Sequence, residues 1–209
     1  MKTSATVTAL ADHLRRDITR GRWADGAVLR QEDLAAEYAV SRIPVREALA
    51  MLQSEGLVAI ETHRGARVVR LTPDDLTEIF DLRLLLESEA LRLAIPGHTQ
   101  RTLNRIRHLQ DDLELETDPA GWMAGDRAFH EALYAPCDRP RLLDLIRHHR
   151  LIVERYGLAA LTPDSRRADW GDEHRALIDA VATRQAEAAV AHLRDHLVDT
   201  RDAIIAALS

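Results

Sequence analysis

The chain contains few cysteines and few aromatic residues. Cys137 is the only cysteine among 209 residues, and aromatic residues make up 4% of the sequence. A single cysteine excludes an intramolecular disulfide framework and a zinc site built from cysteines. Hydrophobic residues nevertheless reach 46%, so a sizeable core is available. Because leucine and alanine dominate that fraction, we expect helices packed on helices.

Long hydrophobic runs are also missing. No apolar stretch approaches the ~18 residues that a membrane-spanning helix needs. The first 17 residues lack the apolar core of a signal peptide. We therefore expect a soluble, cytoplasmic protein with no membrane partner. The sequence also lacks a phosphate-binding glycine loop and an evident catalytic nucleophile, and both absences weigh against an enzyme.

The net charge of −6 argues against DNA binding when the chain is taken whole, but the charge is unevenly distributed. Residues 1–72 hold 11 basic and 9 acidic side chains, whereas residues 73–209 hold 17 basic and 25 acidic ones. The acidic excess therefore lies in the second part. The first part, with a net charge of +2, should attract phosphate only weakly, so the placement of individual arginines matters more than their total.

The first part predicts three helices. Residues 7–18 carry one apolar helical stripe, which ends at Gly21. A second helix is expected over 29–38. A third begins at Ser41, a good N-cap residue, and tolerates Pro44 because the N–H groups of a first turn are unpaired in any case. Its inward-facing stripe consists of Val45, Ala48, Leu49 and Leu52.

Arg42 and Arg46 lie one turn apart on another face of the third helix. An arginine fork matches the O6 and N7 atoms of guanine. The second and third helices therefore predict a helix-turn-helix whose last helix enters the major groove of double-stranded DNA. A solvated helix face with ordinary arginines explains the same spacing equally well.

Two short β-prone runs, 57–60 and 66–69, follow the third helix and enclose a turn at 62–65. Three helices followed by a hairpin form a winged helix-turn-helix. His63 and Arg64 at the tip of the wing are expected to contact phosphate or to reach the minor groove. The alternative is that they are simply polar turn residues.

The segment SRIPVREAL, followed by LQSEGLV and HRGARV, resembles the DNA-binding domain of the GntR family of bacterial transcription regulators. The resemblance spans about residues 8–70. It implies that Arg42 and Arg46 read DNA beside Ser41, and that Arg64 and Gly65 belong to the wing.

Two residues depart from the family pattern. Ala39 stands where the family usually has a glycine, which predicts a tighter or strained turn. Glu32 stands where some members carry an arginine that touches DNA, so that contact should be absent here. Arg30 is the candidate to replace it.

The segment Thr72-Pro73-Asp74-Asp75 has the features of a fresh helix start, so we expect two domains, at 1–71 and 72–209. No strand pattern follows, and an all-α helical bundle is the default. The fold class is therefore expected to be mainly α, a winged helix-turn-helix followed by a bundle. Its six helices are expected near 73–94, 98–116, 119–135, 139–159, 165–183 and 185–208.

Histidines of the second domain suggest a metal site. Asp126 and His130 lie four residues apart on one helical face. If the last two helices form an antiparallel hairpin, His174 and His196 both lie roughly 15–18 Å from its turn and can be neighbours. One aspartate and three histidines suit a divalent ion. His192 shares a face with His196 and is an equal candidate, and ordinary surface histidines remain the simpler explanation.

The patterns DRAFH, EHRAL and HL, in this order, resemble the FCD domain, the effector-binding domain of one GntR subfamily, over about residues 73–208. Six helices resemble its VanR-like branch. The resemblance implies a divalent ion, commonly zinc or nickel, that helps to bind a small carboxylate effector. Its implied ligands are Asp126, His130, His174 and His196.

Arg83 matches an arginine that often faces the effector pocket in that family, and a cation suits a carboxylate ligand. A buried ion pair with Glu87, one turn further on, is an equally good interpretation. The asparagine that usually follows the middle helix is absent from 135–140, which leaves that part of the pocket wall undefined.

These patterns predict a homodimeric transcription regulator, most often a repressor in this family. Its two recognition helices would read an inverted repeat, and a small organic acid at the metal site would bias its state. The alternative is a metal-dependent hydrolase or isomerase with a DNA-binding-like N-terminal domain, in which Glu131 or Glu173 is the general base. A third hypothesis keeps the regulator but makes the metal purely structural.

Overall fold

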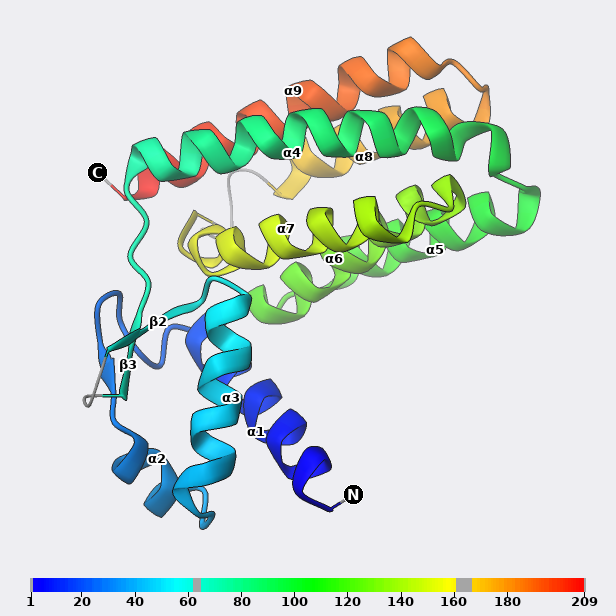
Figure 1. Ribbon diagram of the computed structural model, residues 1–209. Coiled ribbons are helices and arrows are strands. Elements are labelled where there is room, and N and C mark those ends of the chain that lie inside the picture. The colour runs from blue at the N-terminus through cyan, green and yellow to red at the C-terminus, as the bar shows by residue number, and fades with distance from the viewer. Residues whose placement is uncertain (1, 62–64, 161–166, 209) are drawn as a thin grey trace. The chain divides into compact units, whose positions relative to one another are not determined.

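The computed structural model describes residues 2–61, 65–160 and 167–208. The chain divides into two compact units, Met1–Thr72 and Pro73–Ser209. Helices dominate both units (Figure 1), so the expected mainly α fold class is confirmed. Within the described residues, no helix is both long and apolar enough to span a bilayer.

The first unit contains the helices α1 (Lys2–Thr19), α2 (Gln31–Glu37) and α3 (Arg42–Ser54). Helices α1 and α3 pack on each other. Their predicted apolar stripes are buried because the i, i+3, i+4 spacing places each stripe on one helical face. The buried stripes comprise Val7, Leu10, Ala11, Leu14 and Ile18 of α1 and Val45, Ala48, Leu49 and Leu52 of α3.

A three-stranded antiparallel sheet accompanies these helices, with β1 (Val28–Leu29), β2 (Val58–Glu61) and β3 (Gly65–Val68) in the order β1-β3-β2. The sequence predicts the β2–β3 hairpin but not β1. The prediction that Leu29 opens the second helix is wrong, since Leu29 pairs with Ala66 of β3 and is 2% exposed. A two-residue strand is too short to show alternating polarity, so only its pairing with β3 defines it.

Two of the residues with a positive φ in the first unit, Gly65 and Ala39, bear on expectations from the sequence. Gly65 has a φ of 102°, and a Cβ there would collide with the backbone oxygen of Leu29. Glycine thus allows β1 to approach β3, and Gly65 lies in β3 rather than in the predicted turn. Ala39, between α2 and α3, has a φ of 52°. L-residues with a Cβ disfavour this region, in agreement with the strained turn expected there.

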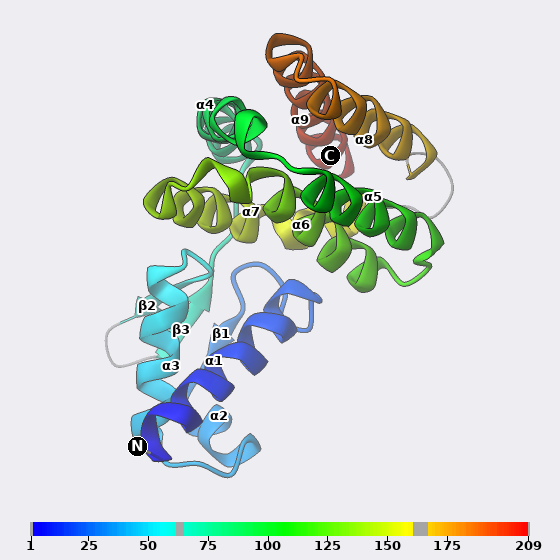
Figure 2. The same cartoon turned by 90° about the vertical axis from the view of Figure 1, so that its right-hand side faces the viewer.

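The second unit is a helical bundle (Figures 1 and 2). Prolines in the 3-10 turns η1 (Ile95–Gly97) and η2 (Ala135–Cys137) mark two of the predicted helix breaks. The main helices follow the predicted ranges closely. They are α4 (Pro73–Ala94), α5 (Gln100–Leu115), α6 (Pro119–Tyr134), α7 (Pro140–Ala160), α8 (Arg167–Ala182) and α9 (Ala186–Ala207).

Helix packing brings the inward faces of α6, α8 and α9 together. Helix α4 packs on α7 and α9, α8 packs on α9 and α5, and α6 packs on α5 and α7. Figure 1 shows α4 and α9 side by side over much of their length. Phe80 of α4 and Phe129 and Tyr134 of α6 are among the largest fully buried side chains. This interior holds the candidate site.

Two left-handed residues shape the turns of the second unit. Arg184, with a φ of 57°, lies between α8 and α9, where the sequence predicts a weak turn. Helices α8 and α9 form the expected hairpin. Asp138, with a φ of 50°, ends η2. Aspartate, like asparagine, tolerates this conformation better than most residues, so Asp138 supports the backbone in the segment that lacks the family's asparagine.

Candidate metal centre, cavity and nucleic-acid interface

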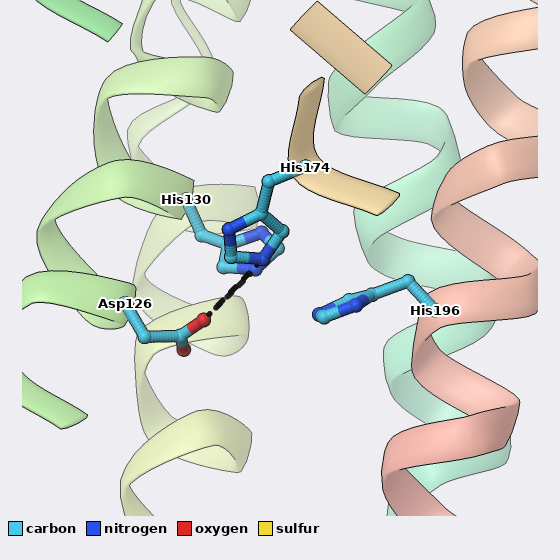
Figure 3. A group of neighbouring side chains, drawn as sticks. All are labelled: Asp126, His130, His174 and His196. Carbon is cyan, nitrogen blue, oxygen red and sulfur yellow. Dashed lines mark ion pairs between the residues drawn. The ribbon is translucent and has the colours of Figure 1, made fainter. Parts of the chain in front are cut away.

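Four side chains from three separate helices converge inside the second unit (Figure 3). Asp126 and His130 come from successive turns of α6, His174 comes from α8 and His196 from α9. All four are buried, and one potential ligand atom from each lies within 4.8 Å of the others. His192 is exposed, so the structure distinguishes it from His196, which the spacing alone does not.

Each histidine of the cluster has a hydrogen-bond partner on Nδ1. His174 Nδ1 lies 2.8 Å from Gln110 Oε1, and His196 Nδ1 lies 2.7 Å from Glu173 Oε2. Both partner atoms are acceptors, so both Nδ1 atoms donate. His130 Nδ1 lies 3.0 Å from the hydroxyl oxygen of Tyr134.

Tyr134 settles the direction of the third bond. Its hydroxyl donates to Glu87 Oε2 at 2.7 Å, so its oxygen accepts from His130 Nδ1. With the proton on Nδ1, the lone pair of a neutral imidazole is on Nε2. Metal-binding histidines are usually oriented by such an outer hydrogen bond.

The Nε2 atoms of His130 and His174 are buried, and neither has a hydrogen-bond partner among the residues that the structure describes. They lie 3.4 Å and 3.7 Å from Asp126 Oδ1. Buried polar atoms are seldom left unpaired without a reason. The described residues therefore form a cluster that could hold a metal ion, in which these two lone pairs and the carboxylate would be ligands.

The charge states of the cluster also suit a cation. Burial, followed by the nearby Arg150 cation, lowers the pKa of His130 to about 4. Burial likewise lowers the pKa of His174. Burial alone would raise the pKa of Asp126, but its interactions with His130 and with the Arg150 cation outweigh that effect and hold the pKa well below its usual range. Neutral imidazoles and an ionised carboxylate are the forms that bind metal.

A buried ion-pair network adjoins the cluster. Arg150 of α7 donates from Nη1 to Glu87 Oε2 at 2.9 Å and from Nη2 to Asp126 Oδ2 at 2.6 Å. Arg83 of α4 donates from Nε to Glu87 Oε1 at 2.6 Å. The two guanidinium groups outweigh the burial of Glu87 and lower its pKa to about 2. The network therefore ties α4, α6 and α7 together through charges that are ionised at neutral pH.

A cavity opens beside this network. Asp126, His196, Arg83 and Arg150 all line it. The two alternatives for Arg83 thus coexist, because its Nε is paired with Glu87 while the residue also borders the cavity. Arginine guanidinium groups at a cavity wall can pair with an anionic ligand.

The residues predicted to read DNA lie on the surface of the first unit. Ser41 occupies the N-cap position of α3 in an extended conformation, although its side chain makes no capping hydrogen bond. Arg42 and Arg46 are exposed on α3. Arg42 Nη2 lies 2.9 Å from Glu32 Oε1 of α2. Glu32, which stands where some family members carry an arginine, thus forms an ion pair with Arg42, a residue predicted to read DNA.

The other predicted DNA contacts are distributed around this helix. Arg30 is exposed and occupies the N-cap position of α2. Gly65 begins β3. His63 and Arg64 lie outside the described residues. Arg30 and Arg42 line a common surface depression together with Gly65, which places these three predicted contacts close together.

Comparison with known proteins identifies both units. The family model described as "Bacterial regulatory proteins, gntR family" matches residues 6–68. The FCD domain model matches residues 78–199, which is more than half of the chain. This chain belongs to the GntR family. Its second unit carries an FCD domain, and the resemblance inferred from the sequence motifs is confirmed.

Members of the GntR family match this chain over both units. The HTH-type transcriptional repressor GlaR of Escherichia coli (strain K12) is 31% identical over 209 residues, covering 92% of this chain and 94% of the relative. The gluconate operon transcriptional repressor of Bacillus subtilis (strain 168) is 26% identical, covering 96% and 86%. A solved structure of a putative transcriptional regulator GntR from Rhodococcus sp. RHA1 superposes with a TM-score of 0.81 at 27% identity, covering 97% and 98%.

The sequence motifs do not include several residues that surround the metal cluster. Tyr134 could have been found, because it lies one turn after His130 on the same helix. Gln110 and Arg150 lie on α5 and α7, outside every motif. Arg150 is one of 28 basic residues, and only the packing of α7 against α4 and α6 distinguishes it.

Neither glutamate considered as a general base is available at the cavity. Glu173 accepts a hydrogen bond from His196 Nδ1. The side chain of Glu131 is 46% exposed and lies 3.7 Å from Arg147. Neither residue lines the cavity. Family membership also assigns the chain to transcription regulators, which are generally not enzymes.

Proposed function

We propose that this chain is a homodimeric, cytoplasmic DNA-binding repressor. A small carboxylate, bound beside a divalent metal ion in the FCD domain, would control its affinity for the operator. The observation that carries the proposal is the pair of buried Nε2 atoms of His130 and His174, which face Asp126 and have no hydrogen-bond partner in the described part of the chain. The relatives named as repressors support the direction of control.

Asp126, His130, His174 and His196 would hold the ion. Imidazole ligands with one carboxylate suit zinc or nickel. When bound, the ion would supply a Lewis-acidic centre that attracts a carboxylate oxygen. The hydrogen bonds from Nδ1 to Tyr134, Gln110 and Glu173 would keep the three imidazoles oriented toward it.

Arg83 and Arg150 would attract the anionic effector. Arg150 already bridges Glu87 of α4 and Asp126 of α6. An acid that takes one of these hydrogen bonds would change the attachment of α4 to the rest of the bundle. Helix α4 begins at Pro73, directly after the DNA-binding unit ends. Control of DNA binding requires that the acid bind one arrangement of this attachment better than the other.

The DNA-binding unit would act in pairs. Two copies of α3 in a dimer would present Arg42 and Arg46 to the two halves of an inverted repeat. Ser41 and Arg30 would contact the sugar-phosphate backbone near the same groove, since such contacts fix the register of the reader. The wing residues His63, Arg64 and Gly65 would contact phosphate or the minor groove.

A fluorescence anisotropy titration tests the proposal. The metal-loaded full-length protein is titrated onto a labelled duplex from the promoter region next to its own gene, with a scrambled duplex of equal length as control. We expect saturable binding to the promoter fragment at moderate salt, weaker binding to the scrambled duplex, and release by an organic acid that stabilises the protein. Equal affinity for both duplexes would contradict sequence-specific regulation.

A further inference from the structure

The cavity beside the metal centre has a polar end and an apolar end. Asp126, Arg150 and His196 mark the polar end on α6, α7 and α9. One to two turns along the same helices, the lining becomes hydrocarbon and aromatic. The apolar end consists of Trp122 and Met123 of α6, Val153 and Gly157 of α7, and Ile204 of α9.

On all three helices, the apolar residues lie toward the same side of the polar residue. In Figure 1, α7 and α9 run the same way and α6 runs the opposite way. The apolar residues follow the polar one on α7 and α9 but precede it on α6. At about 1.5 Å per residue, separations of three to eight residues give a cavity with roughly 5–12 Å between its two ends. Arg127 and Glu154, which also line it, are paired with each other at 2.5 Å.

Trp170 joins the two ends. Its ring centroid lies 5.2 Å from that of Trp122 and 6.4 Å from that of His196. The residue is 3% exposed, and its buried indole Nε1 has no hydrogen-bond partner among the described residues. An indole N–H is only a donor, and a buried donor without an acceptor is unfavourable. A ligand oxygen near the metal centre would satisfy it.

We propose that the effector is a monocarboxylate with an apolar body, an aromatic or branched aliphatic acid, and that the Trp170 indole N–H donates a hydrogen bond to one of its oxygens. This inference rests on the proposed control of DNA binding by a carboxylate. The carboxylate lies at the polar end, near Arg150 and the metal ligands. The apolar body lies against Trp122, Met123 and Ile204.

The same cavity disfavours a polyhydroxylated acid. Each hydroxyl group of a sugar acid needs a partner when it leaves water, and burying one without a partner is unfavourable. The side chains of Val153, Met123 and Ile204 offer none. Arg127 and Glu154 are already paired with each other, and the Thr200 hydroxyl already donates to the backbone oxygen of His196. One relative is named as a gluconate operon transcriptional repressor. We therefore expect this chain to bind a different class of ligand from the sugar acid in that relative's name.

Isothermal titration calorimetry tests the ligand class. The full-length protein, loaded with zinc or nickel, is titrated with phenylacetate, 4-methylpentanoate and gluconate. We expect at least one of the two apolar acids to bind about ten-fold or more tightly than gluconate, since hydrophobic pockets discriminate by roughly 10–200-fold per methylene group. Equal or tighter binding of gluconate would overturn this inference but leave the proposed function intact. If none of the three acids binds, this inference is overturned, and the proposed function is then judged separately by release of the promoter fragment with other acids.

A second tryptophan provides a matched control for the hydrogen bond. Trp170→Phe removes the donor and keeps an aromatic ring, whereas Trp23→Phe makes the same change in the first unit, at a residue that does not line the cavity. We expect Trp170→Phe to weaken binding of the better apolar acid about five- to ten-fold, and Trp23→Phe to leave it within about two-fold. An affinity in Trp170→Phe equal to that in Trp23→Phe would overturn the assigned donor.

A measurement on the unaltered protein keeps the test valid if Trp170→Phe fails to fold. The chain has three tryptophans, so protein labelled with ¹⁵N-tryptophan gives three indole N–H resonances. We expect the resonance of Trp170, assigned with Trp23→Phe and Trp122→Phe, to shift downfield when the apolar acid binds. A Trp170 indole resonance that does not move at saturation would overturn the hydrogen bond.

Discussion

The two units each contain helical arginines, but the surroundings of these arginines are opposite. The first unit has Arg42 and Arg46, and the second has Arg83 and Arg150. The side chain of Arg42 is 67% exposed and shares an ion pair with an equally exposed Glu32. The side chains of Arg83 and Arg150 are 4% and 9% exposed and share the carboxylate of Glu87. An exposed pair contributes about 0–1 kcal/mol to stability, whereas breaking a buried pair is strongly destabilising.

Under the proposed function, one residue type would serve two purposes. Arg42 and Arg46 keep their guanidinium groups in water, so they can exchange water for base edges at little expense to the fold. Arg150 holds three helices in place, so its hydrogen bonds belong to the fold itself. We therefore expect changes in the first unit to alter DNA binding without unfolding, and changes at the centre of the second unit to reduce stability first.

The largest effect is expected from Arg150→Met. This change removes the arginine partner of Asp126 and one of the two buried arginines that pair with Glu87, and we expect the free energy of unfolding to fall by about 3–5 kcal/mol. Urea denaturation in the presence of a chelator measures this loss separately from metal binding. Arg147→Met on the same helix is the control, because the side chain of Arg147 is 51% exposed and its loss should change stability by less than about 1 kcal/mol. Equal losses would mean that the buried network does not stabilise the bundle.

The next largest effect is expected at the metal centre. His196→Ala should weaken binding of zinc or nickel by more than about 100-fold, because even the loss of an outer hydrogen-bond partner weakens metal sites by about 10–100-fold. Competition with a chromogenic chelator measures the affinity. His192→Ala changes an exposed histidine of the same helix and should retain one tightly bound ion per chain. An unchanged affinity in His196→Ala would remove this residue from the ligand set.

Metal removal separates a regulatory ion from a structural one. We expect chelation to lower the melting temperature of the FCD domain, because an ion that binds only the folded state stabilises it, and also to abolish acid-dependent release of DNA. Thermal denaturation with and without the chelator measures the first effect, and anisotropy on the promoter fragment measures the second. If the residual folded protein keeps its affinity for the acid, the ion is purely structural.

A smaller effect is expected from Arg46→Ala. One good bidentate contact to a base is worth about 1–3 kcal/mol, so we expect specific binding to weaken about 10–100-fold with little change in the melting temperature. Arg20→Ala removes the same charge from an exposed position at the end of α1 and should cause a much smaller loss. Anisotropy titrations at one salt concentration compare the two variants. Equal losses would indicate general phosphate attraction rather than base reading.

The smallest effect is expected from Ala39→Gly. Ala39 has a φ of 52°, and relief of this strain should raise the free energy of unfolding of the first unit by about 0.5–1 kcal/mol. Ala36→Gly, inside α2, is the control and should lower it by about 1 kcal/mol. Thermal denaturation compares the two. Destabilisation by both changes would show that the turn is not strained.

Much of the site could be predicted because its residues occur in short motifs. The recognition helix is contiguous from Ser41 to Ser54, and its polarity repeats with the helical period. Asp126 and His130 lie one turn apart on one helix. In contrast, β1 and Arg150 are defined by partners more than 20 residues away, so local patterns carry no information about them.

The sequence alone was enough to predict the family, the two units, the approximate helix ranges of the bundle and a set of metal-ligand candidates, because helix periodicity and motif spacing are local properties. Only the tertiary structure decided between His192 and His196, oriented each imidazole through Tyr134, Gln110 or Glu173, and placed Arg150 between Glu87 and Asp126. These features depend on which helix faces meet in the packed bundle, and that arrangement arises from contacts between distant segments.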